Sequence, residues 1–207
     1  LFWYHPHVRE DAAQELGLYG GILVEAAAAP GSAAGWPAVD REVVLFLDDI
    51  LLSGTDVEPF SREVVTHAMS GRFGNTFLVN GRTDWSLDVR AGERVRFFLA
   101  SAAGTRVFSV RIEEQVLKVI GGDAGRAARE VLTSSVVLAP SDRVVADVLF
   151  QAAGSFRLLH RSPSRTVSLG TIRVTGVPPA TTSSRAAGPA EEDEAPAPRA
   201  PREPREP

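Results

Sequence analysis

The chain has 207 residues, a formal net charge of −4 and no cysteine. An isoelectric point near 5.6 argues against a nucleic-acid-binding surface, which needs a basic patch. Without cysteine there are no disulfides and no thiolate metal ligands, and no apolar run approaches the roughly 20 residues that span a membrane. Hydrophobic residues make up 44% of the chain, which is enough for the core of one or two domains.

The chain opens with an aromatic run, residues 2–4, that favours a β-strand and continues into His5-Pro6-His7. Side chains two apart on an extended chain point to the same face, so His5 and His7 are expected to project together. Pro6 fixes its own φ and keeps His5 extended. Two neutral imidazoles on one face suit a copper, zinc or iron ion. A His-x-His pair alone is weak evidence, because most such pairs are solvated or structural.

The next segments set the domain organisation. Residues 11–14 predict a short helical turn or loop, and residues 1–25 form the opening unit. Residues 26–38, rich in Ala, Gly and Pro, predict a linker. A second domain is predicted over residues 39–177. Residues 178–207 contain almost no large apolar side chain and are dense in Pro, Ala, Glu and Arg, so a disordered tail is expected there.

The second domain reads as a series of short strands. Asn80-Gly81 is a strong turn signal between two of them, and Gly, Pro, Asn and Asp separate the others. Many β-branched-rich strands at short spacing indicate a β-sandwich or barrel. The predicted strands are 42–52, 76–79, 86–89, 94–100, 105–112, 116–120, 131–138, 143–150, 155–160 and 166–174.

One segment near the end of this domain repeats the opening motif. Residues 156–161 (FRLLHR) align by their phenylalanine with residues 2–7 (FWYHPH), so that Leu159 and Arg161 stand where the first copy has its histidines. His160 is expected to face away from both. We therefore predict a surface or interface histidine there, and a second unit that keeps the scaffold without the ligands.

Three other features have structural explanations. His67 lies two residues before Met69, but a blue-copper site also needs a cysteine thiolate, so His67 is predicted to be a loop or interdomain contact. Asp48 and Asp49 are neighbours on a strand and point to opposite faces, so they cannot form a carboxylate dyad. The glycine-rich segment 121–125 lacks phosphate-loop spacing and predicts a turn.

The opening motif and several later segments together resemble the multicopper oxidase (laccase-like) family. The segments that carry the resemblance are FWYHPH, residues 2–7; GLYG followed by ILVE, residues 17–25; THAMSGRFGN, residues 66–75; VNGR, residues 79–82; and KVIGGD, residues 118–123. The resemblance implies an all-β, cupredoxin-like Greek-key β-sandwich over residues 39–177, preceded by the last strands of another cupredoxin domain and followed by the tail. It also implies that His5 and His7 ligate the paired type 3 coppers of a trinuclear cluster.

The resemblance implies an oxidoreductase that oxidises a small-molecule or metal-ion donor and reduces O₂ to water, with copper as cofactor. Its partners would be the missing remainder of the oxidase, namely the start of the first domain and a C-terminal cupredoxin domain. The chain begins with Leu inside a predicted strand, so we expect a fragment or processed chain that is inactive alone. The family further implies a secreted, periplasmic or cell-envelope location, and leaves the donor open.

Two alternatives remain at this point. The chain could be a non-catalytic cupredoxin-fold structural or interaction module, or a truncated remnant, because the His-Cys-His motif and the other histidine pairs of the family are absent. A zinc hydrolase site is disfavoured, because no third ligand stands at suitable spacing.

Overall fold

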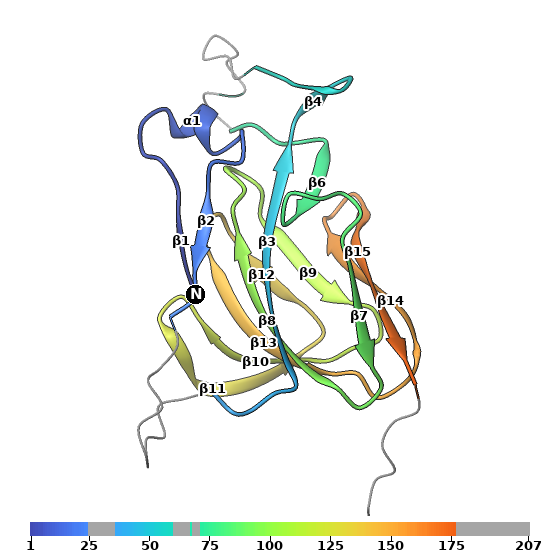
Figure 1. The fold of residues 1–207 in the computed structure, drawn as a ribbon. Coiled ribbons are helices and arrows are strands. Elements are labelled where there is room, and N and C mark those ends of the chain that lie inside the picture. Colours follow the sequence, from blue (N-terminus) through green and yellow to red (C-terminus); the bar gives the residue numbers. More distant parts are fainter. Residues whose placement is uncertain (25–35, 60–66, 68–70, 177–207) are drawn as a thin grey trace, which may run out of the picture.

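The computed structural model describes residues 1–24, 36–59, 67 and 71–176, and nearly all of its regular structure is β-strand (Figure 1). Most of the predicted linker, residues 26–38, and the whole of the predicted disordered tail, residues 178–207, lie outside the described residues. Within the described part of the chain, no helix has the length and hydropathy needed to cross a bilayer.

Two packed sheets form the body of the molecule. The larger sheet has the strand order β11-β10-β13-β8-β3-β6, and the smaller has the order β12-β9-β14-β15-β7. All neighbouring strands run antiparallel except the parallel pairs β3–β8 and β15–β7. The larger sheet contains β3 (Arg41–Ile50), β6 (Thr76–Val79), β8 (Arg94–Ser101), β10 (Leu117–Gly122), β11 (Gly125–Thr133) and β13 (Arg143–Leu149). The smaller contains β7 (Ser86–Arg90), β9 (Phe108–Ile112), β12 (Val136–Leu138), β14 (Gly154–Arg161) and β15 (Thr166–Thr175). The predicted all-β sandwich is confirmed.

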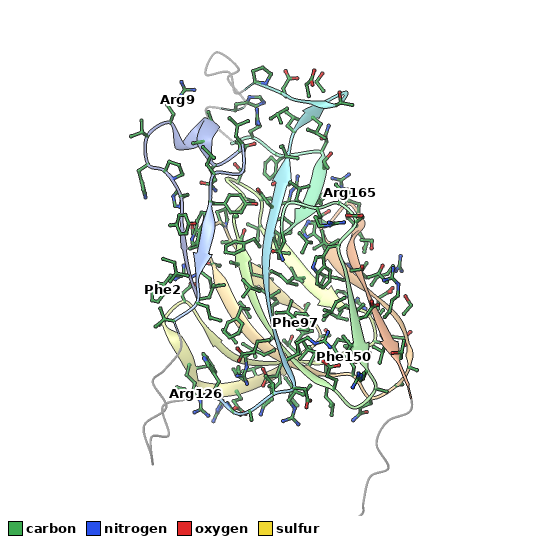
Figure 2. The ribbon with its side chains drawn as sticks, in the orientation of Figure 1. Phe2, Arg9, Phe97, Arg126, Phe150 and Arg165 are labelled. Carbon is green, nitrogen blue, oxygen red and sulfur yellow. The ribbon has the colours of Figure 1, made fainter. Side chains whose placement is uncertain are left out.

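The main core lies between the two sheets and follows the period of two that strands impose. Leu45 and Leu47 of β3 point inward and are fully buried, and Phe108 of β9 faces them from the other sheet. The rings of Phe97 and Phe150 meet edge to face with centroids 6.5 Å apart near the lower end of the sandwich (Figure 2).

One predicted strand is divided in the structure, and one predicted turn joins strands of different sheets. The single predicted strand 131–138 is two strands, β11 and β12, which belong to different sheets on either side of a bend. Asn80 and Gly81 both have positive φ, 51° and 73°, as a tight turn requires. The strands on either side of the turn do not pair with each other, because β6 belongs to the larger sheet and β7 to the smaller. The turn was predicted correctly, although it does not make a two-strand hairpin.

The prediction of a surface location for His160 is wrong. His160 is 2% exposed, and its ring packs against Phe77 at 5.5 Å and Phe108 at 5.1 Å between centroids. His160 pairs with Val110 of the neighbouring strand β9 and its ring faces the core, whereas Arg161 is exposed. Leu159 is buried as well, next to a shift in the β14–β15 register. Its Nδ1 accepts a hydrogen bond from the backbone N–H of Ser109 at 3.1 Å. Burial lowers the pKa of His160, so this imidazole is a neutral core group.

The opening unit forms a small layer on the outer face of the larger sheet. It consists of β1 (Phe2–Tyr4), α1 (Glu10–Ala13) and β2 (Gly20–Ile22), and β1 pairs antiparallel with β2. Figure 1 shows this hairpin beside β3, with α1 beyond its end, near the short hairpin of β4 (Leu52–Ser53) and β5 (Asp56–Val57). The outer face of the sheet is apolar at Phe46, Ala100 and Ala102, and the opening unit covers these residues. β2 lies against this face because Gly21 has no Cβ, which would come within 2.7 Å of the Phe46 ring.

Replacing Asp147 by Ala should lower the free energy of unfolding by about 3–5 kcal/mol, the usual cost of leaving one partner of a buried ion pair unpaired. The Arg96 side chain is 1% exposed and bonds both oxygens of Asp147, at 2.8 and 2.9 Å. Urea unfolding followed by tryptophan fluorescence measures the change. In the control, Arg82→Ala breaks an exposed ion pair with Asp84 and should leave the midpoint unchanged. Equal effects of the two substitutions would contradict this account.

Candidate metal centre

His5 and His7 lie just beyond the end of β1, where the strand leaves the sheet face. Their ring centroids are 4.7 Å apart with an interplanar angle of 34°. His5 is half-buried and stacks on Trp3 with centroids 4.2 Å apart and planes 23° from parallel, while His7 is exposed. The sequence pattern predicted that the two imidazoles would project together, and the structure brings their rings side by side.

The nitrogen atoms of this pair suit a metal ion. Nδ1 of His5 is buried and has no hydrogen-bond partner among the described residues. A buried polar atom without a partner is costly, and a bound metal ion would remove that cost. Imidazole nitrogen is also a good ligand for copper and zinc. The chemistry of the donors therefore fits a copper ion, with two ligands supplied here.

Two imidazoles are fewer than a closed metal site needs. Across residues 1–24, 36–59, 67 and 71–176, no three His, Cys, Asp or Glu side chains are grouped so that they could hold an ion. Within these described residues the pair therefore supplies at most two ligands to a metal centre.

A cavity of about 390 Å³ lies beside His5, between the opening unit and the sandwich. Its wall includes His67, Glu15 and Arg72. The buried Arg72 guanidinium bonds Glu15 Oε2 at 2.7 Å. The pKa of Glu15 is nevertheless raised, because the cost of burying the carboxylate outweighs the attraction of Arg72. His67, predicted as a loop or interdomain contact, lines this cavity together with His5, whereas Met69 lies outside the described residues.

A chain of aromatic rings leads from the histidines into the sheet. Trp3, which stacks on His5, meets Tyr19 edge to face at 6.3 Å between centroids. Tyr19 in turn packs against Phe46 at 5.8 Å. These contacts hold β1 on the sheet and set the position of the His5 ring, which rests on Trp3.

Tyr19 also makes the main polar contact between the opening unit and β3. Its hydroxyl donates a hydrogen bond to Asp48 Oδ2 at 2.8 Å. Burial raises the pKa of Asp48 from its ordinary 3.8 to about 7. Burial also raises the pKa of Tyr19, and the Asp48 carboxyl adds to that shift. Sequence reasoning missed this pair, although an acid at an outward position of an otherwise apolar strand is a usable signal.

Asp49 points the other way, as the alternation along a strand predicts. Its Oδ2 accepts a hydrogen bond from Arg106 Nε at 2.7 Å and another from the backbone N–H of Gly74. The carboxyl groups of Asp48 and Asp49 thus lie on opposite faces of the larger sheet and form no dyad.

Comparisons with known proteins agree on one family. A family model described as multicopper oxidase matches residues 43–173. The multicopper oxidase LPR1 of Arabidopsis thaliana is 26% identical over 178 residues, which cover 81% of this chain and 28% of that protein.

Solved structures show the same fold. The laccase-like multicopper oxidase CueO from Ochrobactrum sp. superposes with a TM-score of 0.70 at 23% identity, over 86% of this chain and 42% of that one. Lac15 from a marine microbial metagenome gives a TM-score of 0.61 at 27% identity, over 96% of this chain and 47% of that one. The chain thus spans less than half the length of these relatives, and the predicted cupredoxin-like sandwich is confirmed.

Replacing Asp48 by Asn should remove a pH dependence of stability that this carboxyl creates. Its folded pKa, about 7, lies above the ordinary 3.8, so the folded state binds more protons between these values. The stabilisation from protonating Asp48 is therefore full below pH 3.8 and is lost as the pH rises through 7. At 1.36 kcal/mol per pKa unit it amounts to at most about 4 kcal/mol.

Urea unfolding at a series of pH values between 4 and 8 measures this effect, by comparison of the unsubstituted chain with Asp48→Asn. The difference in unfolding free energy between the two proteins should change with pH in the direction given above. A constant difference across the series would show that Asp48 does not carry a raised pKa.

Proposed function

Because the chain belongs to the multicopper oxidase family, we propose that it supplies His5 and His7 as ligands to the copper ions of an oxidase. That oxidase couples oxidation of a small-molecule or metal-ion donor to reduction of O₂ to water. The family match covers residues 43–173, and members of this family are copper proteins. Copper, once bound, would accept and pass on single electrons.

The observation that carries the proposal is the histidine pair itself. The two rings lie 4.7 Å apart, and one buried nitrogen of His5 has no partner among the described residues. The stack of His5 on Trp3 at 4.2 Å holds the ring in place before any ion arrives, so little conformational entropy would be lost on binding. His7, which is exposed, remains accessible to an ion from solution.

The other ligands would come from polypeptide that this chain does not contain. The sequence has no cysteine, so it cannot supply the thiolate of a blue-copper site. We assign residues 1–25 to the closing strands of a first cupredoxin domain and residues 39–177 to a second domain without copper ligands. The partners are then the start of the first domain and a C-terminal cupredoxin domain.

The outer surface of the β1–β2 hairpin supports this assignment. Phe2, Tyr4 and Ile22 are 55%, 59% and 52% exposed, and Figure 2 shows Phe2 at the edge of the molecule, away from the sandwich core. A two-stranded hairpin is marginally stable on its own, and a contiguous apolar face indicates a surface that another element covers. Further strands of a first domain would cover it.

A second candidate function is a non-catalytic cupredoxin-fold module for structure or interaction. It is favoured by the absence, within the described residues, of any group of three side chains able to hold an ion. Copper binding by the histidine pair separates the two candidates, because a purely structural module has no need of it.

Titration of the chain with Cu(II) should reveal one site that depends on both histidines. His5→Ala and His7→Ala should each weaken binding by at least about tenfold, since each removes one of two imidazole ligands. Isothermal calorimetry measures the affinity. His67→Asn is the matched control, because His67 lines the neighbouring cavity but is not one of the two proposed ligands. Equal affinity in all four proteins would remove the basis of the proposal.

The isolated chain should show no oxidase turnover, since its sequence has no cysteine thiolate and its described residues group no third ligand with the histidine pair. Oxygen uptake measured with an electrode, with a phenolic, ferrous or cuprous donor and excess copper, should equal that of copper and donor without protein. Joining the chain to the domains of a relative that supply the other ligands should produce turnover that depends on His5 and His7. Turnover by the isolated chain would show that the catalytic parts have been misplaced.

A further inference from the structure

The aromatic chain that supports His5 continues to a proton acceptor. His5 stacks on Trp3 at 4.2 Å, Trp3 meets Tyr19 at 6.3 Å, and the Tyr19 hydroxyl donates to Asp48 Oδ2 at 2.8 Å. Tryptophan and tyrosine are the two side chains of this series that can lose an electron. They stand in direct sequence between a candidate metal ligand and a carboxylate.

We propose that Trp3, Tyr19 and Asp48 form a relay that carries an oxidising equivalent away from the histidine pair. The relay ends as a neutral radical on Tyr19, with the phenolic proton on Asp48. In the assembled oxidase, the oxidant would be a one-electron oxidant arising at copper held by His5 and His7, so this part of the inference rests on the proposed function.

The steps balance in electrons and protons. The indole of Trp3 would give one electron to the oxidant, which would be reduced by one electron. Tyr19 then gives one electron to the oxidised indole, which restores Trp3. The phenolic O–H bond breaks as this electron leaves, and the proton moves along the existing hydrogen bond to Asp48 Oδ2, where a new O–H bond forms. The products are reduced oxidant, a neutral tyrosyl radical and a protonated Asp48.

The local surroundings favour this end point. An oxidised phenol is a strong acid, so the electron leaves readily only where an acceptor lies within hydrogen-bond reach. Asp48 is placed for this, since its Oδ1 already accepts the backbone N–H of Asp49 while Oδ2 faces the phenol. The raised pKa of Asp48, near 7, makes its carboxylate a better proton acceptor than an ordinary aspartate.

An exit from the relay is also present. Tyr19 and Asp48 both line a cavity of about 600 Å³, whose wall also includes Glu15 and Asn80. A small reductant entering this cavity could return an electron to Tyr19, and the proton on Asp48 could then return to the phenolate oxygen. The relay would thus spare the histidine ligands from oxidation.

The test uses the whole chain without copper. A ruthenium–bipyridine photosensitiser, coordinated to the exposed imidazole of His7, is oxidised by flash and quench and acts as the one-electron oxidant. The chain has two tyrosines, Tyr4 and Tyr19, so a Tyr4→Phe background assigns any tyrosyl radical to Tyr19. Transient absorption and EPR spectroscopy then follow the radical.

The relay predicts a tyrosyl signal in Tyr4→Phe. Adding Tyr19→Phe should abolish it and leave a long-lived tryptophan radical. Adding Trp3→Phe should reduce the tyrosyl signal to background. Asp48→Asn, which keeps the shape but lacks the basic carboxylate, should slow its formation. Trp36→Phe is the matched control, because the Trp36 ring packs against Arg96 and is not one of the proposed relay rings, so it should change nothing.

Several results would overturn the relay. The first is the absence of a tyrosyl signal in folded Tyr4→Phe. The second is a tyrosyl signal that Trp3→Phe does not diminish, and the third is a rate of tyrosyl formation that Asp48→Asn does not change. Circular dichroism and thermal unfolding of each variant separate a lost relay from a lost fold. If Trp3→Phe fails to fold, the Tyr4→Phe/Tyr19→Phe variant tests the tryptophan step instead. A persistent tryptophan radical in that variant supports the relay, and the absence of this radical counts against it. Since no copper is present, failure here is distinct from failure of the copper titration.

Discussion

The contact between the opening unit and the outer face of the larger sheet determines the rest of this structure. An ordinary two-sheet sandwich leaves its outer faces to water, but here the outer face carries Phe46, Ala100 and Ala102. Trp3 and Tyr19 cover it, and the bond from Tyr19 to Asp48 fixes their register. Since β1 is held in this way, His5 and His7 project from its end at a fixed place beside the sandwich. The copper-binding proposal and the relay both depend on this contact.

The buried ionisable side chains of the larger sheet are satisfied in different ways. Arg96 is satisfied by Asp147, Glu42 and the carbonyl oxygen of Pro37. Asp48 has no guanidinium partner, and it lowers the cost of burial by accepting bonds from Tyr19 and the backbone and by holding its proton to higher pH. One group is therefore a structural ion pair, while the other remains able to exchange a proton. That difference singles out Asp48 as the proton acceptor in the relay.

Much of the fold could be predicted from the sequence, because strands of one sandwich have a simple period and the turns between them use Gly, Asn and Asp. The strands around Leu45 and Phe97 were found in this way, and so was the turn at Asn80. What failed was the single strand predicted over residues 131–138, which divides between two sheets. The turn at Asn80-Gly81 did not reveal that it joins strands of different sheets. Local sequence fixes a strand or a turn, whereas the choice of partner depends on contacts far along the chain.

The site was predicted in the same uneven way. The side-by-side rings of His5 and His7 follow from their spacing and from Pro6. The inward face of His160 could not be predicted from alternation alone, which says that neighbours differ but not which of them faces the core. The pairing of Tyr19 with Asp48, 29 residues apart, depends on how the opening unit docks, so no local pattern reveals it.

The central claim is that His5 and His7 together bind copper, and its most direct test is pulsed EPR of the chain loaded with one equivalent of Cu(II). We predict couplings from two imidazole nitrogens, one lost in His5→Ala and one in His7→Ala. A spectrum of oxygen ligands only, or one unchanged by both substitutions, would contradict the account.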